Sequence, residues 1–581
     1  MTNSSDISPG PREAREAREP REPPGPGAGA VREVQHARRV LIVGGGTAGW
    51  ITASLLRRAA PAEVTISLIE SSDIPTVGVG EATLPGIRTL LRYIGIDEAE
   101  FLAEADASFK LGIRFHGWNP GRPYWHPFGA VTGPGVLVDD WLRKAAAGDA
   151  PPIDSVLGQG IWDIAAANLA PQSARCQPYT GDLPVYAYHL DAGRLAELLK
   201  KHAIAAGVRH VVDNVTGVNV RPDGWIRQVH TEAHGALPAD LFFDCSGFRG
   251  LLINQALGEP FEPFGQQLWC DRAVALNVPG QPAARGDVAP YTSSTTAEAG
   301  WIWQIPLFSR SGNGYVYCSS YIEQDQAEAE LRAFLGAGDG VAARHIRIRT
   351  GKSRRVWVGN CIAVGLSGGF IEPLESTGIA LIQDVGEFFV HFSPDLAWDD
   401  VFAAKLNGFM DASYDFIRDF VACHYLTAAR SDTPFWRDVR QDPAVRTALI
   451  DEVLGLWDRG QLHSIQHADG SRPAFRPYSW AYIIGGNGVL PQRAAPAQVD
   501  PAELAQARAE LDGKTATVKA LAGLLPDNRE RLRDLRQTWE RGERPEGEPD
   551  REAYARAPHQ LVTGYLTDGQ EVPWAPNRSR A

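Results

Sequence analysis

Three glycines near the start of the chain have the spacing of a dinucleotide-binding loop. Gly44, Gly46 and Gly49 fill a G-x-G-x-x-G pattern. Glycines at these positions allow a tight turn, the approach of a pyrophosphate to backbone N–H groups, and close packing of a helix on a strand. Glu70 follows about twenty residues later, where a carboxylate can accept hydrogen bonds from a ribose. The pattern predicts dinucleotide binding; it disfavours a 2′-phosphate and leaves NAD and FAD open.

The segments around these glycines predict the β-α-β unit that such a loop needs. Residues 39–43 are apolar and rich in β-branched side chains, and they stop at Gly44. Residues 47–59 have apolar side chains at helical spacing, and residues 64–69 alternate as a second strand that ends at Glu70. The glycine loop therefore lies between a strand and a helix, which is the context that gives the motif its meaning.

Two later segments predict that the same sheet is interrupted and then resumed. Residues 239–244 and 361–365 are apolar strands that run into small residues, which lets the backbone approach a ligand closely. We therefore expect an α/β, Rossmann-like fold whose insertions build the substrate region. Longer helical patterns follow in residues 381–392, 400–420 and 501–524.

Composition limits the class of protein. The chain has 581 residues, a formal net charge of −13 and 44% hydrophobic residues. The negative charge argues against a nucleic-acid partner and against binding to an anionic membrane surface. No apolar run is long enough to span a bilayer, and no signal-peptide pattern is present. Six cysteines without a C-x-x-C pair indicate neither a disulfide framework nor a metal site and favour a cytoplasmic location.

The chain divides into four predicted regions. Residues 1–37, rich in Pro, Gly, Arg and Glu, are expected to be a disordered N-terminal arm, with a docking arm for a partner as the alternative. Residues 38–384 are expected to form the dinucleotide-binding domain with its substrate-binding insertions. Residues 385–540 are expected to form a mostly helical cap over the substrate site, and residues 541–581 a loose C-terminal tail.

Five motifs in order along the chain carry a resemblance to the flavin-dependent tryptophan halogenases. The most specific is Trp-Ile-Trp-Gln-Ile-Pro, which matches the W-x-W-x-I-P run of that family. The resemblance covers about residues 38–525 and implies a monooxygenase-like FAD-binding flavoprotein fold. The motifs are Gly44–Trp50, Val77–Thr83, Asp244–Gly250, Trp301–Pro306 and Glu372–Ile379.

The resemblance also implies a reaction and its partners. Members of the family use FADH2 from a separate flavin reductase, O2, and chloride or bromide to make hypohalous acid. The oxidant then travels through an internal tunnel to an indole. These implications make FAD, a halide and O2 the expected cofactors, and a homodimer is a further expectation. No metal is expected.

Two residues match the family's catalytic pair. Lys110, within Phe109-Lys110-Leu111, corresponds to the family lysine that hydrogen-bonds the oxidant or becomes a chloramine. A lysine in an apolar strand is desolvated, which favours both roles, although pattern alone favours an exposed lysine at a strand edge. Glu375 corresponds to the family glutamate that orients the oxidant or accepts the ring proton. It is also placed to cap the next helix, and both roles are compatible.

The remaining assignments rest on the resemblance. Thr377 and Gly378 match the chloride site, where backbone N–H groups at a helix start suit a small anion. Trp301 and Trp303 match the residues that keep substrate away from the flavin, with core packing as the alternative. The flavin-binding residues implied are Gly44, Gly45, Gly46, Thr47, Ala48, Gly49, Glu70, Ser71, Ile74, Ala82, Leu366 and Ile379.

Aromatic residues are expected to hold the indole. His126 and Phe128 match the family's H-x-F pair, whose flat side chains enclose the ring, although a histidine among aromatics is often structural. Trp480 is expected to stack on the indole, and Ser376 to lie near substrate and chloride. The tyrosine pair and acid that hold free tryptophan in the family are not evident around residues 471–482. Free tryptophan and a tryptophan-containing peptide therefore remain open as substrates.

Other functions remain to be separated from halogenation. A flavin monooxygenase shares the predicted fold, and a halogenase of another indole metabolite shares the chemistry. A monooxygenase is expected to lack the tryptophan pair at 301 and 303 and the pair Lys110 and Glu375. A non-catalytic flavoprotein is expected to have lost motif residues, and the key residues are all present.

Overall fold

The computed structural model describes residues 34–73, 80–129, 134–158, 160–173, 184–279, 288–462, 465, 475–492 and 500–543. The N-terminal arm before residue 34, Ile74 and the tail beyond residue 543 lie outside these ranges. The predicted boundary of the arm at residue 37 is too late. β1 (Gln35–His36) pairs with β24 (Ala397–Trp398), and Ala37 is buried.

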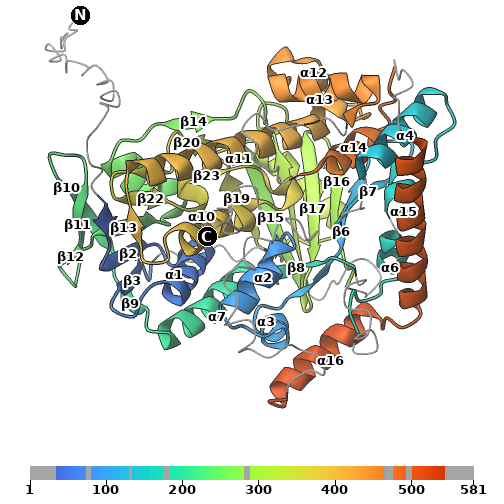
Figure 1. The fold of residues 1–581 in the computed structure, drawn as a ribbon. Coiled ribbons are helices and arrows are strands. Elements are labelled where there is room, and N and C mark those ends of the chain that lie inside the picture. The colour runs from blue at the N-terminus through green and yellow to red at the C-terminus, as the bar shows by residue number, and fades with distance from the viewer. Residues whose placement is uncertain are drawn as a thin grey trace, which may run out of the picture.

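The dinucleotide fold is a six-stranded sheet in the order β21-β22-β13-β2-β3-β9 (Figure 1). β2 (Arg39–Val43) lies parallel to β3 (Thr65–Glu70) on one side and to β13 (Leu241–Asp244) on the other. β22 (Cys361–Ala363) continues the sheet in parallel, so both returning strands predicted from the sequence are confirmed. The other members are β9 (Arg209–Val212) and β21 (Trp357–Val358).

Helices cover this sheet because its strands are apolar on both faces. α1 (Thr47–Ala59) begins at the predicted residue and packs between α7 (Ala192–Ala205) and α10 (Gly378–Phe392). At the crossing with α10, Gly386 lies against the side chain of Leu55, where a methyl group would clash. The close approach fixes the N-terminus of α10 relative to that of α1.

A second, seven-stranded sheet forms the substrate half, in the order β19-β15-β18-β17-β16-β6-β7. β17 (Gly300–Pro306), which carries the W-x-W-x-I-P run, lies between β16 (Thr292–Ala297) and β18 (Arg310–Tyr317). The other strands are β6 (Gly112–His116), β7 (Tyr124–Pro127), β15 (Arg272–Pro279) and β19 (Ala343–Arg347).

A small sheet, β4-β8-β5, holds the strand with Lys110. β5 (Ser108–Lys110) and β4 (Gly80–Ala82) pair with opposite edges of β8 (Ala187–Asp191), and all three residues of β5 are buried. Because β5 continues directly into β6 at Gly112, Lys110 lies where this sheet meets the larger one. The helices nearby are α2 (Gly86–Tyr93) and α3 (Glu98–Glu104).

The helices after residue 385 do not form a separate layer. α11 (Asp400–Thr427) packs against β21 and α10 of the dinucleotide half and, farther along, against α14 (Pro477–Gly486) of the substrate half. Figure 1 shows this long helix crossing the molecule above both sheets. The other α-helices in the described ranges are α4 (Pro134–Ala146), α5 (Ile153–Leu157), α6 (Ile161–Ala166), α9 (Gln324–Leu335), α12 (Pro434–Gln441), α13 (Ala448–Arg459), α15 (Pro501–Ala522) and α16 (Asn528–Glu540).

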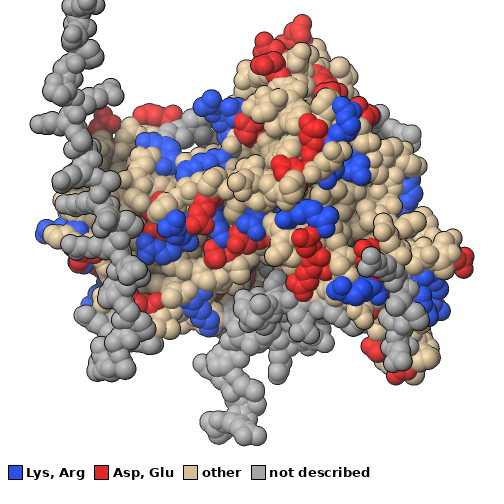
Figure 2. Space-filling view, turned by 90° about the horizontal axis from the view of Figure 1, so that it is seen from above, with Lys and Arg blue, Asp and Glu red and all other residues tan. Residues whose placement is uncertain are grey.

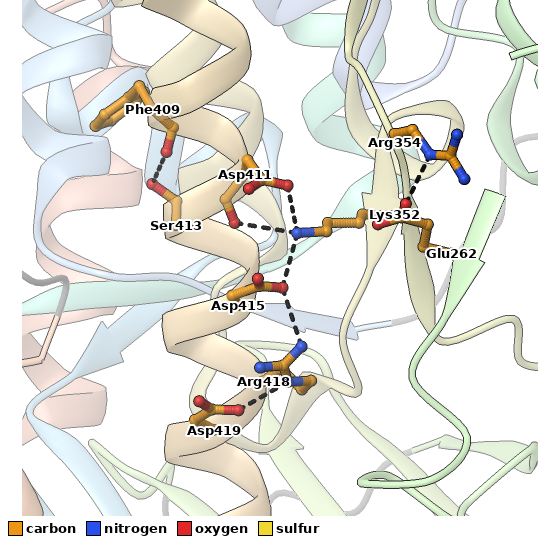
Figure 3. A network of polar contacts seen from close by, with 9 residues as sticks. All are labelled: Glu262, Lys352, Arg354, Phe409, Asp411, Ser413, Asp415, Arg418 and Asp419. Carbon is orange, nitrogen blue, oxygen red and sulfur yellow. Dashed lines mark hydrogen bonds and ion pairs between the residues drawn. The ribbon is translucent and has the colours of Figure 1, made fainter. Parts of the chain in front are cut away.

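A network of charges fixes α11 to β20 (Gly351–Ser353), as Figure 3 shows. The buried Lys352 ammonium lies 2.8 Å from an oxygen of Asp415 and also pairs with Asp411. Arg418 joins Asp415 at 3.0 Å and Asp419 at 2.7 Å. Asp411 and Asp415 lie one helical turn apart, so Lys352 forms ion pairs with two successive turns of α11. This contact holds the helix that supplies Phe420 and His424 to the site.

Charges on the face drawn in Figure 2 are mixed, with acidic and basic side chains interspersed rather than gathered in one basic patch. Among the described residues, no helix is both long enough and apolar enough to cross a membrane.

Candidate active site

The glycine loop has the geometry that a bound dinucleotide requires. Gly44 has φ +118°, and a side chain there would overlap the carbonyl of Cys245 on the neighbouring strand. A side chain at Gly49 would overlap the carbonyl of Gly44, so both positions require glycine. Gly46, the N-cap of α1, makes no side-chain capping bond and faces open space. The first N–H groups of α1 therefore face a cradle suited to a pyrophosphate.

Glu70 is held at the end of β3 beside the loop. Its Oε1 lies 2.7 Å from Nε2 of His210 and 3.1 Å from the ammonium of Lys200. Its other oxygen lies against Gly45, where a Cβ would overlap it. The paired Oε1 orients the carboxylate, and Oε2 faces the loop as a ribose-binding group would. Ser71 bonds Asn214 at 2.5 Å instead, so its hydroxyl is already engaged as a donor.

The other predicted flavin contacts come from three elements around the start of α1. Gly365 has φ +68° and begins the short helix that carries Leu366, and a Cβ there would lie 2.9 Å from that of Ala48. Ile379 lies in the first turn of α10, which packs on α1 and on this short helix. Ala82 ends β4. These residues fit FAD; Ile74 lies outside the described residues.

Lys110 is fully buried, with 0% of its surface exposed. Its ammonium nitrogen donates to the carbonyl oxygen of Thr83 at 3.1 Å and to the hydroxyl of Ser376 at 2.8 Å, and it lies 4.9 Å from the centre of the Phe128 ring. Burial lowers the pKa of Lys110 to about 7, although the nearby charge of Glu375 acts in the opposite direction. A lysine that is partly neutral at pH 7 can act as a nucleophile.

Glu375 lies between two histidines. Nδ1 of His126, on β7, is 2.9 Å from Oε2, and Nε2 of His424, on α11, is 2.8 Å from Oε1. Burial acts to raise the pKa of Glu375, but the charge and hydrogen bond of His126, together with His424, outweigh it and lower the pKa to about 2. Glu375 is therefore a buried carboxylate, and the capping alternative is not observed because α10 has no side-chain cap.

The corner that presents these groups is strained. Ser376 has φ +61°, in the left-handed region, which costs about 1–2 kcal/mol for a residue with a Cβ. This conformation ends the short helix Pro373–Glu375 and turns the chain into α10. The turn brings the Ser376 hydroxyl to Lys110 while Glu375 faces the histidines. A strained backbone of this kind persists only where the surrounding structure holds it in place, and such residues cluster at functional sites.

The predicted chloride residues lie at the start of α10. Thr377 is the N-cap and makes no side-chain capping bond, the first turn holds no acid, and Gly378 borders open space. The N-terminal N–H groups are thus available to a small anion. The corner at Ser376 places this position next to both Lys110 and the elements of the dinucleotide fold.

Trp301 is anchored by a residue that the sequence analysis did not single out. Its indole N–H donates to Oε2 of Glu372 at 2.9 Å, and the Tyr425 hydroxyl donates to the same oxygen at 2.5 Å. Burial raises the pKa of Glu372 to about 7, against the lowering effect of these two hydrogen bonds. Trp303 packs over Gly314, where a methyl group would clash. Both tryptophan rings are held rigidly.

Aromatic rings surround His126, but Trp480 is not among them. The ring centres of Phe420, Phe475 and Tyr482 lie 5.9, 6.1 and 5.9 Å from that of His126. Trp480 is 0% exposed and meets Phe420 edge-on at 4.9 Å, while Phe475 stacks on Phe420 at 4.0 Å. Phe475 and Tyr482 thus lie next to His126, and the stacking of Trp480 on an indole stays a prediction.

His424, Glu372 and Phe475 were missed because each is recognisable only through a partner that is distant in sequence. A signal existed for His424: it lies four residues after Phe420, one helical turn farther along the same helix. His126 and His424 each bond Glu375. Among the described residues, no group of three or more His, Cys, Asp or Glu side chains could hold a metal ion.

Comparison with known proteins agrees with this geometry. The family model described as tryptophan halogenase matches residues 39–503. Tryptophan 6-halogenase SttH of Streptomyces toxytricini is 41% identical over 80% of this chain and 92% of its own. Its crystal structure has a TM-score of 0.75, at 37% identity, and covers 86% of this chain and 99% of its own.

Two further relatives differ in the substrate that their names give. Tryptophan 7-halogenase RebH of Lentzea aerocolonigenes is 35% identical over 79% of this chain and 91% of its own. The structure of MibH, described as a lanthipeptide tryptophan 5-halogenase, has a TM-score of 0.70 at 31% identity, and the match covers 92% of this chain and 96% of that one. The family model matches most of the chain, and the glycine loop and the buried lysine agree with it. The chain therefore belongs to the tryptophan halogenase family of flavin-dependent halogenases.

Proposed function

We propose that this protein halogenates the indole ring of tryptophan, free or within a peptide, using FADH2, O2 and chloride or bromide. The observation that supports this most is the position of Lys110. It is fully buried, bonded to Ser376 and close to Glu375, directly beside the start of the helix that borders the dinucleotide fold. An amine in this position can hold an electrophilic halogen in a site closed to water.

Each group of residues at the site has its own role in the proposed reaction. When bound and reduced by a separate flavin reductase, FAD would supply, together with O2, the oxidation of the halide to hypohalous acid. The glycine loop and Glu70 hold the cofactor, and the N–H groups at Thr377 and Gly378 hold the halide. Trp301, fixed by Glu372, keeps the indole away from the flavin. Lys110 receives the oxidant, and the aromatic rings around His126 and Phe128 hold the indole beside it.

The substrate is proposed at the level of tryptophan, without a choice between the amino acid and a peptide. The names of SttH and RebH refer to tryptophan, and that of MibH to a peptide. The rings of Phe475 and Tyr482 beside His126 suit a flat indole in either setting. A cytoplasmic location and a homodimer are also part of the proposal.

Mass spectrometry tests this function. Purified protein receives FAD, a flavin reductase, NADH, O2 and chloride, with free tryptophan and a tryptophan-containing peptide in parallel reactions. We expect a product with the chlorine isotope doublet in at least one reaction, and no such product when chloride is left out. A hydroxylated product that forms equally well without halide would show a monooxygenase instead.

A further inference from the structure

His189 is a fully buried histidine at the centre of the small sheet that holds Lys110. It lies on β8, directly opposite Ser108 of β5 on one side and Ala82 of β4 on the other. Its Nδ1 is 3.2 Å from the Ser108 hydroxyl, and its Nε2 is 2.9 Å from the hydroxyl of Thr292 on β16. The ring therefore joins the lysine-bearing strand to a strand of the seven-stranded sheet.

The hydrogen bonds of His189 have a fixed direction. The Ser108 hydroxyl donates to the carbonyl oxygen of Pro306 at 2.5 Å, so its only proton is used and its oxygen accepts from Nδ1. Burial and the nearby charge of Lys110 lower the pKa of His189 well below its usual value, although a hydrogen bond to the Pro306 carbonyl acts in the opposite direction. The ring is therefore neutral with its proton on Nδ1, and Nε2 accepts from the Thr292 hydroxyl.

Ser108 connects this chain of hydrogen bonds to the lysine. Side chains two residues apart on a strand point to the same face, so Ser108 and Lys110 leave β5 on one side. Pro306, which accepts from Ser108, is the last residue of the W-x-W-x-I-P run. The chain therefore fixes β5 against β16 and β17, and with it the point from which the Lys110 side chain extends.

β8 also holds the group that accepts a hydrogen bond from the lysine. The Lys110 ammonium donates to the carbonyl oxygen of Thr83 at 3.1 Å. The backbone N–H and the hydroxyl of Thr83 donate to the carbonyl of Tyr188 at 3.0 and 2.8 Å, and the Tyr188 N–H donates to the Thr83 hydroxyl at 3.1 Å. Consecutive residues of β8, Tyr188 and His189, thus hold the acceptor of Lys110 and the strand that carries it.

Charged and titratable groups reach the Lys110 region from the elements packed around β5. Glu375, in the turn before α10, acts to raise the pKa of Lys110. On the other strands of the small sheet, burial raises the pKa of Glu81 to about 7, and Asp191 pairs with Arg310 at 2.6 Å. Burial is the effect that lowers the pKa of Lys110 to about 7, so this pKa reports how deeply the amine is held.

We propose that His189 is a positioning residue for Lys110, acting through its hydrogen bond to Ser108. The bond holds β5 so that the lysine amine stays between the Ser376 hydroxyl and the Thr83 carbonyl. The inference rests on the proposed halogenation, in which this amine receives the oxidant. When β5 shifts, the amine becomes more solvated, and hypohalous acid passes into solution instead of reaching the indole.

The variants His189→Phe and His189→Asn test the proposal. Phenylalanine keeps a flat ring without a donor, whereas asparagine keeps an N–H near the position of Nδ1. With His189→Phe we expect halogenated product to fall about 10²-fold, the cost of a displacement of about 1 Å. Hypohalous acid, trapped by a dissolved dione, should increase, and FAD affinity and flavin reoxidation should be unchanged. His189→Asn should keep product formation within about tenfold of the unaltered protein, because it loses only the contact with Thr292.

The pKa of Lys110 gives a readout that does not depend on turnover. It is measured by an NMR pH titration of protein with lysine labelled at the ε-carbon, and the signal is assigned by its loss in Lys110→Met. His189→Phe should raise this pKa above 7, because a more solvated amine binds its proton more strongly, and His189→Asn should restore it.

A second variant and a control complete the test. Ser108→Ala removes the same hydrogen bond from the other strand and leaves every ring in place, so it replaces His189→Phe if that variant does not bind FAD. It should raise the pKa of Lys110 in the same direction. His202→Asn is the control, because His202 on α7 bonds Glu100 at 2.9 Å instead of the small sheet. It should leave the pKa of Lys110 and the product yield unchanged.

The outcomes are separable. If His189→Phe or Ser108→Ala binds FAD and keeps both the product yield and the pKa of Lys110, the bond does not position the lysine and the proposal is wrong. The proposal is also wrong if His189→Asn is as impaired as His189→Phe, or if His202→Asn shifts the pKa equally. If the unaltered protein halogenates neither tryptophan nor the peptide, the proposed function fails, and the NMR titration still decides whether His189 positions Lys110.

Discussion

Replacing Lys110 by methionine should separate oxidant formation from halogenation. Methionine has similar length and no amine. The pKa of Lys110, lowered by burial to about 7, leaves about half of the amine neutral at pH 7, whereas an ordinary lysine would be about one part in 3,000 neutral. Burial thus raises the reactive fraction by about 10³-fold. Because Lys110→Met removes the amine altogether, halogenation should fall by at least that factor.

The assay follows two rates in one reaction. Flavin reoxidation by O2 is measured optically and should be unchanged, while halogenated product is measured by mass spectrometry and should nearly vanish. In the unaltered enzyme, product formation should rise about tenfold per pH unit below 7 and level off above it, since only the neutral amine is the nucleophile. A Lys110→Met variant that halogenates within about tenfold of the unaltered rate would refute this reasoning.

Three further predictions follow from the buried groups and the glycine loop. Lys110→Met should raise stability at pH 7, by at most about 5 kcal/mol. The pKa of Lys110 in the folded protein, about 7, lies below the ordinary value of 10.5. Between these two pH values the unfolded chain binds more protons than the folded one, so the free energy of unfolding should increase with pH. Urea unfolding should show this trend in the unaltered protein and not in the variant. Gly44→Ala should abolish FAD binding, measured by flavin fluorescence, whereas Gly408→Ala, on open helix surface, should not; equal affinity in both would contradict the account of the loop. Glu372→Gln should lower the urea midpoint by an amount equivalent to about 1–3 kcal/mol, because its amide would lack a partner, and should shift tryptophan fluorescence as Trp301 loosens; an unchanged spectrum would argue against the anchoring role.

The sequence predicted the dinucleotide half well because its signals are local. Each signal can be read from one short segment. These signals are the glycine spacing and the apolar strands 39–43, 239–244 and 361–365, which pair with other apolar strands of the same sheet. The start of α1 at Thr47 matched because the glycines leave no other place for the helix to begin. The end of α11 was set seven residues too early, at Phe420 rather than Thr427, because its last turns bury polar residues such as His424 that resemble a helix end.

The substrate half was harder to predict. The seven-stranded sheet was not predicted, and the W-x-W-x-I-P run of its strand β17 was recognised only as a family motif. Trp480 on the indole stays a prediction, whereas the stack of Phe475 on Phe420 was not anticipated because it joins two segments that are distant in sequence. The histidine pair on Glu375 joins residues 126, 375 and 424, which no spacing rule relates.

A crystal structure of the protein with FAD, bromide and tryptophan would test the central claim most directly. We predict anomalous scattering from bromide at the N–H groups of Thr377 and Gly378, and an indole ring carbon within reach of the Lys110 amine among the rings around His126. An indole bound against the flavin, or bound away from Lys110, would contradict the account.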